Sequence, residues 1–94
     1  MGSSDQEGWA PLVGQVVVVD TNSSFVYLGT LARVEEHFLV LANVDAHDQN
    51  EGPSTKEQYV MDTKRFGVKP NRKEVSVRKT MVVSVSRLDD VVTY

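Results

Sequence analysis

The stretch FVYLGTLARVEEHFLVLANV, residues 25–44, decides the fold that we predict for this chain. Residues 25–34 and 38–44 are rich in β-branched, aromatic and other apolar side chains, as is typical of β-strands. The polar sequence EEH at positions 35–37 is a short connection between them, and such a connection indicates a hairpin. The stretch therefore predicts two antiparallel strands.

Gly29 predicts a sharp bend in the first of these strands. Glycine weakens a strand and is usually tolerated where the strand bends or where another backbone comes close. The apolar spacing agrees, because Val26 and Leu28 share a face whereas Leu31 lies three residues beyond Leu28. A β-bulge at Gly29-Thr30 would absorb this slip. Strongly bent strands are characteristic of small barrels.

Three further strands are predicted outside this hairpin, at residues 15–20, 74–78 and 81–87. The first is a β-branched run bounded by turn residues, and the other two alternate with the two-residue period of a strand. In the last strand Met81, Val83 and Val85 share one face, and we expect Val83 to point into the core. Residues 78–80 form a tight connection before it. Five short strands joined mostly by hairpins predict an all-β fold, a small antiparallel barrel.

An insert separates the third predicted strand from the fourth. Residues 45–52 are acidic and rich in turn residues, and we expect them to supply no core. Residues 55–66 are predicted as a helix, and a strand at residues 58–62 is the alternative. Residues 68–73 are predicted as a basic turn.

The predicted helix has recognisable ends. Ser54 and Glu57 have the spacing of a capping box, basic residues occupy the last turn, and Gly67 follows the helix. The helical period places four residues along one face: Tyr59, Val60, Thr63 and Phe66.

The composition is that of a single globular domain. The chain has 94 residues, of which 40% are hydrophobic and 24% are charged, and we assign residues 9–94 to one domain. Residues 1–8 are polar and rich in Gly and Ser, so they are predicted to be flexible. No apolar run approaches the roughly 18 residues that span a bilayer. We therefore expect an intracellular protein, cytoplasmic or nuclear, that does not associate with a membrane.

The sequence offers little for catalysis or for metal binding. It contains no cysteine, which excludes a disulfide scaffold, a thiolate zinc site and a cysteine nucleophile. Asp45, His47 and Asp48 lie on one turn-rich segment but lack the spacing and the fourth ligand of a zinc site. The sequence has no phosphate-binding glycine loop and no nucleophile elbow. We therefore predict a protein that is not an enzyme and has no cofactor.

Charge is distributed unevenly along the chain. The net charge of −3 at pH 7 argues by itself against a general nucleic-acid binder. However, residues 1–63 carry ten acidic side chains and two basic ones, whereas residues 64–79 carry seven basic side chains and one acidic one. The second segment is either a solvated charged loop or a local basic patch for an anionic partner.

The order of these features resembles that of a known family. The sequences LVGQVVV at residues 12–18, GTL at 29–31 and VEEHFLVLANV at 34–44 together resemble the first motif of the Sm and LSm proteins. The sequence VSVRKTMVVSV at residues 75–85 resembles their second motif. The two motifs cover most of the chain outside its ends and the insert.

The resemblance implies an Sm-like fold, which is an SH3-like barrel of five strongly bent antiparallel strands with a short N-terminal helix. Sm-like proteins close into rings by pairing the fourth strand of one subunit with the fifth strand of the next. The residues independently favour self-association, because residues 81–85 form an apolar edge strand that neither proline nor lysine protects. We therefore expect self-association into a ring through strands 4 and 5.

The resemblance also implies a site for single-stranded, often uridine-rich RNA in the pore of the ring. The family uses the loop after its second strand and the loop before its fifth, and these hold His37 and Phe38, and Arg78 and Lys79, respectively. His37 or Phe38 would stack on a base, and the two cations would place positive charge near the pore. The first loop lacks the family's asparagine, and Lys79 and Thr80 stand where the family has a glycine and an acidic or amide residue.

These patterns lead to one hypothesis and two alternatives. The hypothesis is a non-catalytic, ring-forming scaffold associated with single-stranded RNA. The first alternative is an Sm-fold protein–protein interaction module without RNA recognition, which the altered loops and the acidic composition favour. The second is a solitary SH3-like barrel that binds a peptide. In each alternative Phe38 is a packing residue of the hairpin and His37 is an ordinary surface residue.

Overall fold

The computed structural model describes residues 8–93. The segment predicted to be flexible, residues 1–8, lies outside the described residues except for Gly8. Gly8 and Trp9 are helical and lead into the 3-10 turn η1 (Ala10–Leu12).

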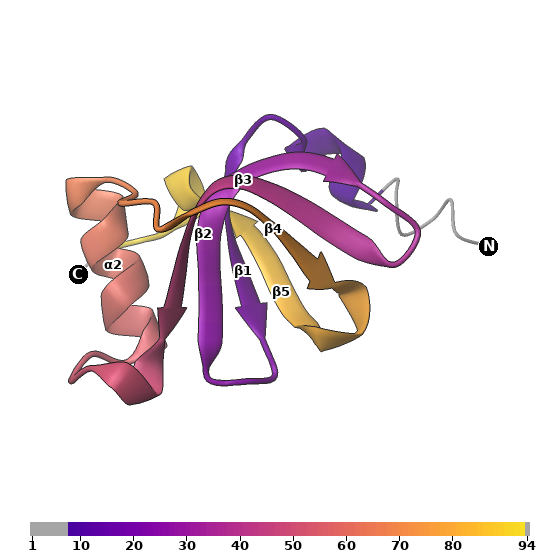
Figure 1. The fold of residues 1–94 in the computed structure, drawn as a ribbon. Helices are drawn as coiled ribbons and strands as arrows, with labels where there is room; N and C mark the ends of the chain where they lie inside the picture. The colour runs from indigo at the N-terminus through magenta and orange to yellow at the C-terminus, as the bar shows by residue number, and fades with distance from the viewer. Residues whose placement is uncertain (1–7, 94) are drawn as a thin grey trace.

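The fold is mainly β, as predicted. Five strands form one open sheet in the order β4-β3-β2-β1-β5, and every neighbouring pair is antiparallel. The strands are β1 (Val16–Thr21), β2 (Phe25–Val34), β3 (Phe38–Asp48), β4 (Arg72–Arg78) and β5 (Val82–Arg87). The sheet curls strongly, and its edge strands β4 and β5 are connected in the chain by the 3-10 turn η3 (Lys79–Met81) (Figure 1). The hairpin predicted at residues 35–37 is closed by a 2.8 Å hydrogen bond from the Glu35 N–H to the Phe38 carbonyl oxygen.

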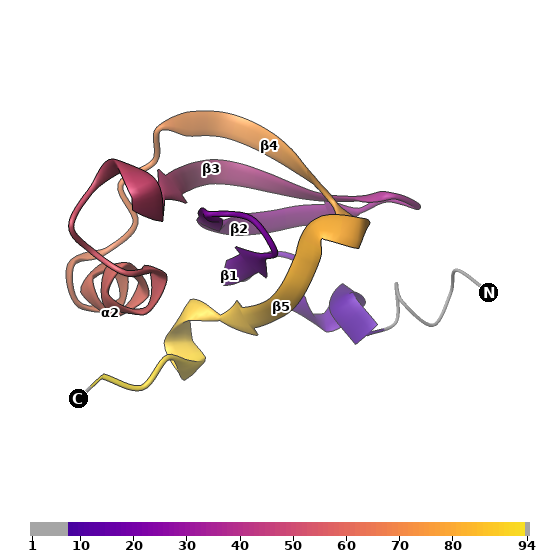
Figure 2. The same cartoon turned by 90° about the horizontal axis from the view of Figure 1, so that it is seen from below.

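The sheet has a hydrophobic core on each face. The first core consists of Val17, Val19, Leu31, Leu39, Leu41, Val44 and Val77, and partly buried side chains of η1, β4 and β5 pack against it. The second core consists of Val18, Val26 and Leu28. It is covered by the insert helix and by the chain after β5, which lie away from the N-terminal end (Figure 2). The insert is thus part of the folded domain, because it shields apolar side chains that would otherwise face water.

The two cores explain the apolar spacing in β2. Leu31 belongs to the first core, whereas Val26 and Leu28 belong to the second. Successive side chains of a strand point to opposite faces, so the three-residue step is ordinary alternation in a strand that is buried on both sides. Our interpretation of this step as a slip along β2 was wrong.

A bulge does lie at this point, but on the neighbouring strand. Leu28 pairs with Asp45 and Thr30 pairs with Ala42. Two residues of β3 therefore oppose the single residue Gly29. The predicted bend is present, and the extra residue belongs to β3 instead of to Gly29-Thr30.

Gly29 lies where the bulged backbone of β3 comes close to β2. A Cβ atom at this position would lie 3.0 Å from the Ala42 carbonyl oxygen and 3.1 Å from both the Asn43 carbonyl oxygen and the Val44 Cα. Asn43 itself adopts a left-handed backbone conformation with a φ of 53°. The bend therefore depends on a residue without a side chain.

β3 continues four residues beyond its predicted end, so residues 45–48 are strand and not turn. None of residues 45–52 belongs to either hydrophobic core, as expected. Asp45 is only 4% exposed. Its carboxylate accepts a hydrogen bond from the hydroxyl of Tyr59 in the insert. An acidic residue is tolerated in this buried position because the insert supplies a hydrogen-bond donor.

The ladder between β3 and β4 also extends beyond β4. Asn71, within the predicted basic turn, donates from Nδ2 to the Ala46 carbonyl oxygen at 3.1 Å and accepts from the Ala46 N–H at 3.0 Å. Its side-chain amide therefore forms the two hydrogen bonds with the β3 backbone that one more strand residue would form.

The insert contains the helix α2 (Lys56–Phe66), close to its predicted bounds, and the alternative of a strand is excluded. The N-cap is Thr55 instead of Ser54, because the Thr55 Oγ1 accepts from the Gln58 N–H at 3.1 Å. Gly67 ends the helix with a φ of 91°, a conformation that glycine adopts easily.

One member of the predicted buried face of α2 is exposed. Tyr59 and Val60 pack against the second core and Thr63 is buried, as expected. Phe66 is 74% exposed. It occupies the last position of α2 and is not packed against the second core.

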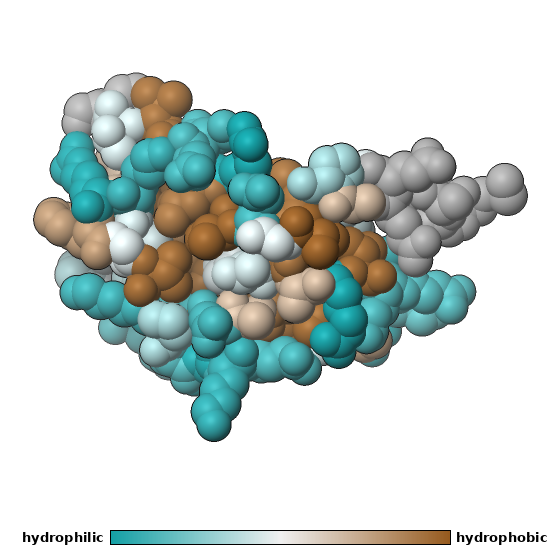
Figure 3. All heavy atoms as spheres, turned by 90° about the horizontal axis from the view of Figure 1, so that it is seen from above, coloured by the Kyte–Doolittle hydropathy of each residue, from teal (hydrophilic) through white to brown (hydrophobic). Residues whose placement is uncertain are grey.

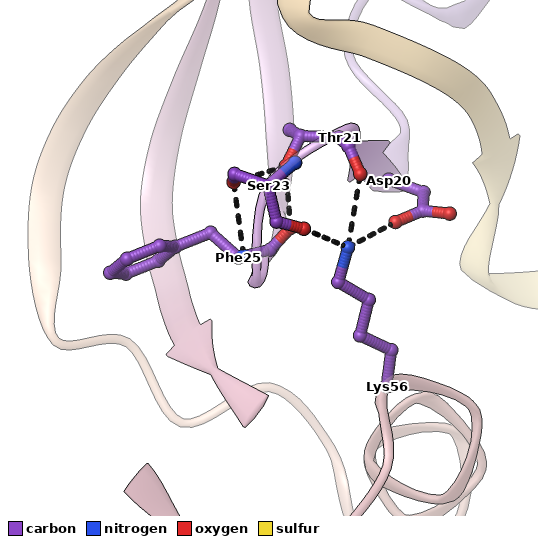
Figure 4. A network of polar contacts seen from close by, with 5 residues as sticks. All are labelled: Asp20, Thr21, Ser23, Phe25 and Lys56. Atoms are coloured by element: carbon purple, nitrogen blue, oxygen red, sulfur yellow. Dashed lines mark hydrogen bonds and ion pairs between the residues drawn. The ribbon is translucent and has the colours of Figure 1, made fainter. Parts of the chain in front are cut away.

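Lys56 fastens the N-terminal end of α2 to the turn between β1 and β2 (Figure 4). Its Nζ donates to the Asp20 Oδ1 at 2.8 Å, the Thr21 carbonyl oxygen at 3.0 Å and the Ser23 carbonyl oxygen at 2.6 Å. These contacts use the three donors of the ammonium group. The Thr21 hydroxyl donates in turn to the Phe25 carbonyl oxygen at 2.7 Å. The insert is therefore held by polar contacts at its start and by apolar contacts along its length.

In β5, the side chains that face the core are not the ones that the sequence predicts. Asp20 pairs with Ser84, and the next residue of β1, Thr21, pairs with Val82. Val83 is therefore an extra residue in a bulge of β5. Val82 and Val85 pack against the first core, whereas Val83 is 63% exposed. The expectation that Val83 points into the core is wrong, because the bulge shifts the alternation by one residue.

Candidate nucleic-acid interface

The four residues selected from the sequence lie together. Phe38 is the first residue of β3 and Arg78 is the last residue of β4, and they are paired in the β3–β4 ladder. The Arg78 Cζ lies 5.4 Å from the centre of the Phe38 ring. This distance places the guanidinium in cation–π contact with the ring.

Lys79 connects this pair to two other parts of the chain. Its backbone N–H donates to the His37 carbonyl oxygen at 2.9 Å. Its Nζ lies 5.3 Å from the centre of the Trp9 ring. In Figure 1, η1, the β2–β3 turn and η3 lie on the side of the molecule away from α2. These contacts bring three distant segments together, and we call the residues that make them the aromatic–basic site: Trp9, His37, Phe38, Arg78 and Lys79. Trp9 packs against the first core, whereas Phe38 and Arg78 point to the opposite face of the sheet from their core neighbours Leu39 and Val77.

Trp9 was not selected by sequence reasoning. Its cationic partner, Lys79, lies near the other end of the chain, and no local spacing connects the two residues. The available signal was its uniqueness, because Trp9 is the only tryptophan of the sequence.

The aromatic–basic site is accessible to a ligand. The His37 side chain is 72% exposed and its Nε2 lies 3.9 Å from a carboxylate oxygen of Glu36. Arg78 is exposed, and Trp9, Phe38 and Lys79 are half-buried. Figure 3, seen from above relative to Figure 1, shows apolar residues bordered by hydrophilic ones on that face of the molecule. Half-buried aromatic rings are held in position by the core while part of their surface remains available for contact.

The basic side chains of the chain differ in whether they form ion pairs. Arg33 forms ion pairs with Glu35 at 2.8 Å and with Glu74 at 3.8 Å, and its hydrogen bond to Glu35 raises the pKa of the guanidinium. Lys56 and Arg87 are paired with Asp20 and Asp90. Within residues 8–93, neither Arg78 nor Lys79 forms an ion pair. An anionic ligand would therefore meet no competing described carboxylate on either side chain.

Neither the models of known protein families nor the sequences of curated proteins match this chain. In the part of the chain that the structure describes, no helix has the length and apolar character needed to cross a membrane. In the same residues, no three histidine, cysteine, aspartate or glutamate side chains are grouped so that they could hold a metal ion.

A second polar cluster joins α2 to β3. The rings of His47 and Tyr59 stack with centres 3.6 Å apart and an angle of 6° between their planes. Burial and the hydrogen bond to Asp45 raise the pKa of Tyr59 to about 12. Asp48 accepts a hydrogen bond from the Asn50 N–H at 2.9 Å, which lowers the pKa of its carboxyl. The three residues considered as metal ligands therefore have other contacts: Asp45 accepts a hydrogen bond from Tyr59, His47 stacks on Tyr59, and Asp48 caps the turn after β3.

Replacing Tyr59 with phenylalanine tests this cluster. Tyr59→Phe leaves the carboxylate of Asp45 buried without its donor, so we expect the free energy of unfolding at pH 7 to fall by about 1–3 kcal/mol. The folded chain holds the tyrosine pKa above its ordinary value of about 10. The stabilisation is therefore complete below pH 10 and is lost as the pH rises towards 12.

Urea denaturation of the parent and the variant across this pH range provides the measurement. The difference between their free energies of unfolding should be constant up to pH 10 and shrink above it. A variant as stable as the parent at pH 7 would show that the hydrogen bond does not stabilise the insert.

Proposed function

We propose that this chain is an Sm-like, ring-forming scaffold that binds single-stranded RNA without catalysing a reaction. One observation carries the proposal, the meeting of the β2–β3 turn and the end of β4 in the aromatic–basic site. These are the two places in the sequence where the resemblance implies an RNA site. The sheet order supports the same fold, because it leaves β4 and β5 as the edges through which Sm-like subunits pair.

The chemistry of the site suits a single strand. An aromatic face stacks on an unpaired base, and Arg and Lys side chains contact the phosphates on either side. Phe38 and Arg78 supply one such combination within 5.4 Å. The net charge of the chain is −3, but a ring would repeat Arg78 and Lys79 once per subunit around its pore. Local positive potential, which attracts a polyanion, is therefore compatible with an acidic protein.

Binding is tested by titrating fluorescently labelled oligouridine with the protein at several salt concentrations. We expect binding that weakens steeply as salt rises, since cations contacting phosphates release counterions. The matched control is a double-stranded RNA of the same length, whose bases are not free to stack. No binding of oligouridine at low salt would overturn the RNA part of the proposal.

Assembly is tested separately, through the exposed edge of β5. Light scattering should give a mass that is a multiple of 10.5 kDa, the mass of one chain. Val83→Lys places an ammonium group on an edge strand, which disfavours strand pairing between copies. Because Val83 is 63% exposed, we expect this variant to keep its circular dichroism spectrum while its mass falls towards that of one chain.

A matched control for assembly is Val92→Lys, because Val92 is 68% exposed but lies after β5. This variant should retain the mass of the parent. A parent that has a mass of 10.5 kDa at high micromolar concentration, or a Val83→Lys variant with the mass of the parent, would contradict ring formation through β5.

The second candidate function is a protein–protein interaction module that has lost RNA recognition. It is favoured by the carboxylates of Glu35 and Glu36, which directly precede His37 in the chain and would repel a phosphate chain. A multimer that fails to bind oligouridine at low salt would favour this candidate. A monomer that fails to bind would favour a solitary barrel.

A further inference from the structure

A cavity of about 410 Å³ lies between α2, the strands β1 and β2, and the chain after β5. Val18 and Val26, two buried residues of the second core, form its floor. Its apolar lining consists of six side chains: Val18, Val26, Val60, Met61, Val91 and Val92. Sites for small molecules usually have volumes of about 300–1,000 Å³ and a mostly apolar lining. The cavity therefore has the size and the lining of a small-molecule site.

Polar contacts hold the walls of this cavity in place. At the N-terminal end of α2, Lys56 donates three hydrogen bonds to β1 and to the turn that follows it (Figure 4). Further along α2, the Lys64 Nζ donates to the Asp89 carbonyl oxygen at 2.7 Å. Asp89 lies in the 3-10 turn η4 (Leu88–Asp90), which directly precedes Val91. Because both walls are already fixed, a ligand loses little affinity to the ordering of the protein.

Three polar residues also line the cavity: Asp20, Lys56 and Glu57. The Lys56 ammonium donates to the Asp20 carboxylate and to two carbonyl oxygens, so its three donors are engaged. Within residues 8–93, the carboxylate of Glu57 forms no ion pair. The polar lining thus holds two carboxylates and one ammonium, which leaves excess negative charge. This charge attracts a cationic group of a ligand and repels an anionic one.

We propose that this cavity binds a small apolar cation, which is a molecule with a hydrophobic body and one ammonium group. The body packs on the valines of the lining, which removes apolar surface from water. The ammonium lies beside the carboxylates of Asp20 and Glu57, where α2 begins. This inference does not rest on RNA binding, because no residue of the aromatic–basic site lines the cavity.

Three probes with the same hydrophobic body and different head groups test the proposal: phenylbutylamine, phenylbutanol and phenylbutyrate. Each is titrated at pH 7 into the isotope-labelled full-length protein, and the backbone amide signals are followed by two-dimensional NMR. We expect the amine to shift the signals of lining residues in β1, β2, α2 and the chain after β5. Attraction by two carboxylates replaces repulsion when the amine is exchanged for phenylbutyrate, so the amine should bind at least about fivefold more tightly. The alcohol should bind with an intermediate affinity.

Variants test the charged and the apolar part of the lining separately. Glu57→Gln removes the charge but keeps the length of the side chain, so it should weaken amine binding by about 2- to 5-fold and leave alcohol binding unchanged. Its matched control is Glu51→Gln, because Glu51 is also an exposed acidic residue of the insert but does not line the cavity. Met61→Trp adds bulk to the apolar lining and should weaken the binding of all three probes.

The probe series uses the parent protein, so it tests the proposal even if a variant fails to fold. Amide shifts that are absent at millimolar amine, or that are as large around the exposed Val13 and Val83 as in the lining, would overturn the cavity as a binding site. Equal affinities for the amine and for phenylbutyrate would overturn the proposal of a cation site. Equal effects of Glu57→Gln and Glu51→Gln on amine binding would overturn it as well.

Discussion

Gly29→Val is expected to lower the free energy of unfolding by about 2 kcal/mol, although valine has the better strand propensity. The added Cβ would lie 3.0–3.1 Å from three backbone atoms of β3, and backbone cannot move aside as a flexible side chain can. Overpacking of this kind costs about 1–3 kcal/mol or more, whereas the gain in strand propensity is at most about 1 kcal/mol. For a chain of this size the melting temperature should fall by roughly 8–16 °C.

The matched control for this variant is Gly52→Val. A Cβ at Gly52 would meet nothing within 4 Å, and the φ of −161° is extended backbone that any residue adopts. This control should melt within about 2 °C of the parent, as surface substitutions usually do. If Gly29→Val melts at or above the temperature of the parent, the close crossing of β2 and β3 is not what requires glycine.

The double change Arg78→Ala with Lys79→Ala is expected to abolish oligouridine binding. It removes both cations of the aromatic–basic site, and the salt dependence that remains should be nearly flat. In terms of counterion release, each lost phosphate contact lowers the slope of log K against log salt by about 0.7 for a single strand. The measurement is the anisotropy titration at several salt concentrations, with light scattering to confirm that the mass is unchanged.

A charge-matched control is Lys69→Ala with Lys73→Ala. Both lysines are exposed and belong to the same basic segment of the sequence, but they precede β4 or lie at its start, away from Arg78. This control changes the net charge equally and should retain most of the binding. A double variant at positions 78 and 79 that binds as well as the parent would show that these cations do not contact RNA, and the protein-interaction candidate would then be favoured.

Local signals in the sequence were sufficient for the strands, the helix and the bend. Residues 25–34 were predicted as a strand and form β2, and residues 55–66 were predicted as a helix and contain α2. Both elements have strong internal patterns and clear ends. Gly29 marked the bend because a glycine inside an apolar strand usually lies at a bend or at a close approach of backbone. His37, Phe38, Arg78 and Lys79 were selected through the resemblance to the Sm and LSm proteins, which places them in the two loops that this family uses for RNA.

The tertiary structure alone decided the second core, the end of β3, the phase of β5 and the membership of Trp9 in the site. Asp45 can be buried in a strand because Tyr59 of the insert donates to it, and Val83 is exposed because the pairing with β1 skips one residue. Trp9 meets Lys79 because η1 and the strands on either side of the β4–β5 connection pack on the same core. Propensity and periodicity describe how a segment folds against its own neighbours in the chain. A hydrogen-bond donor, a bulge or a ring partner supplied by a distant segment exists only after the chain has folded.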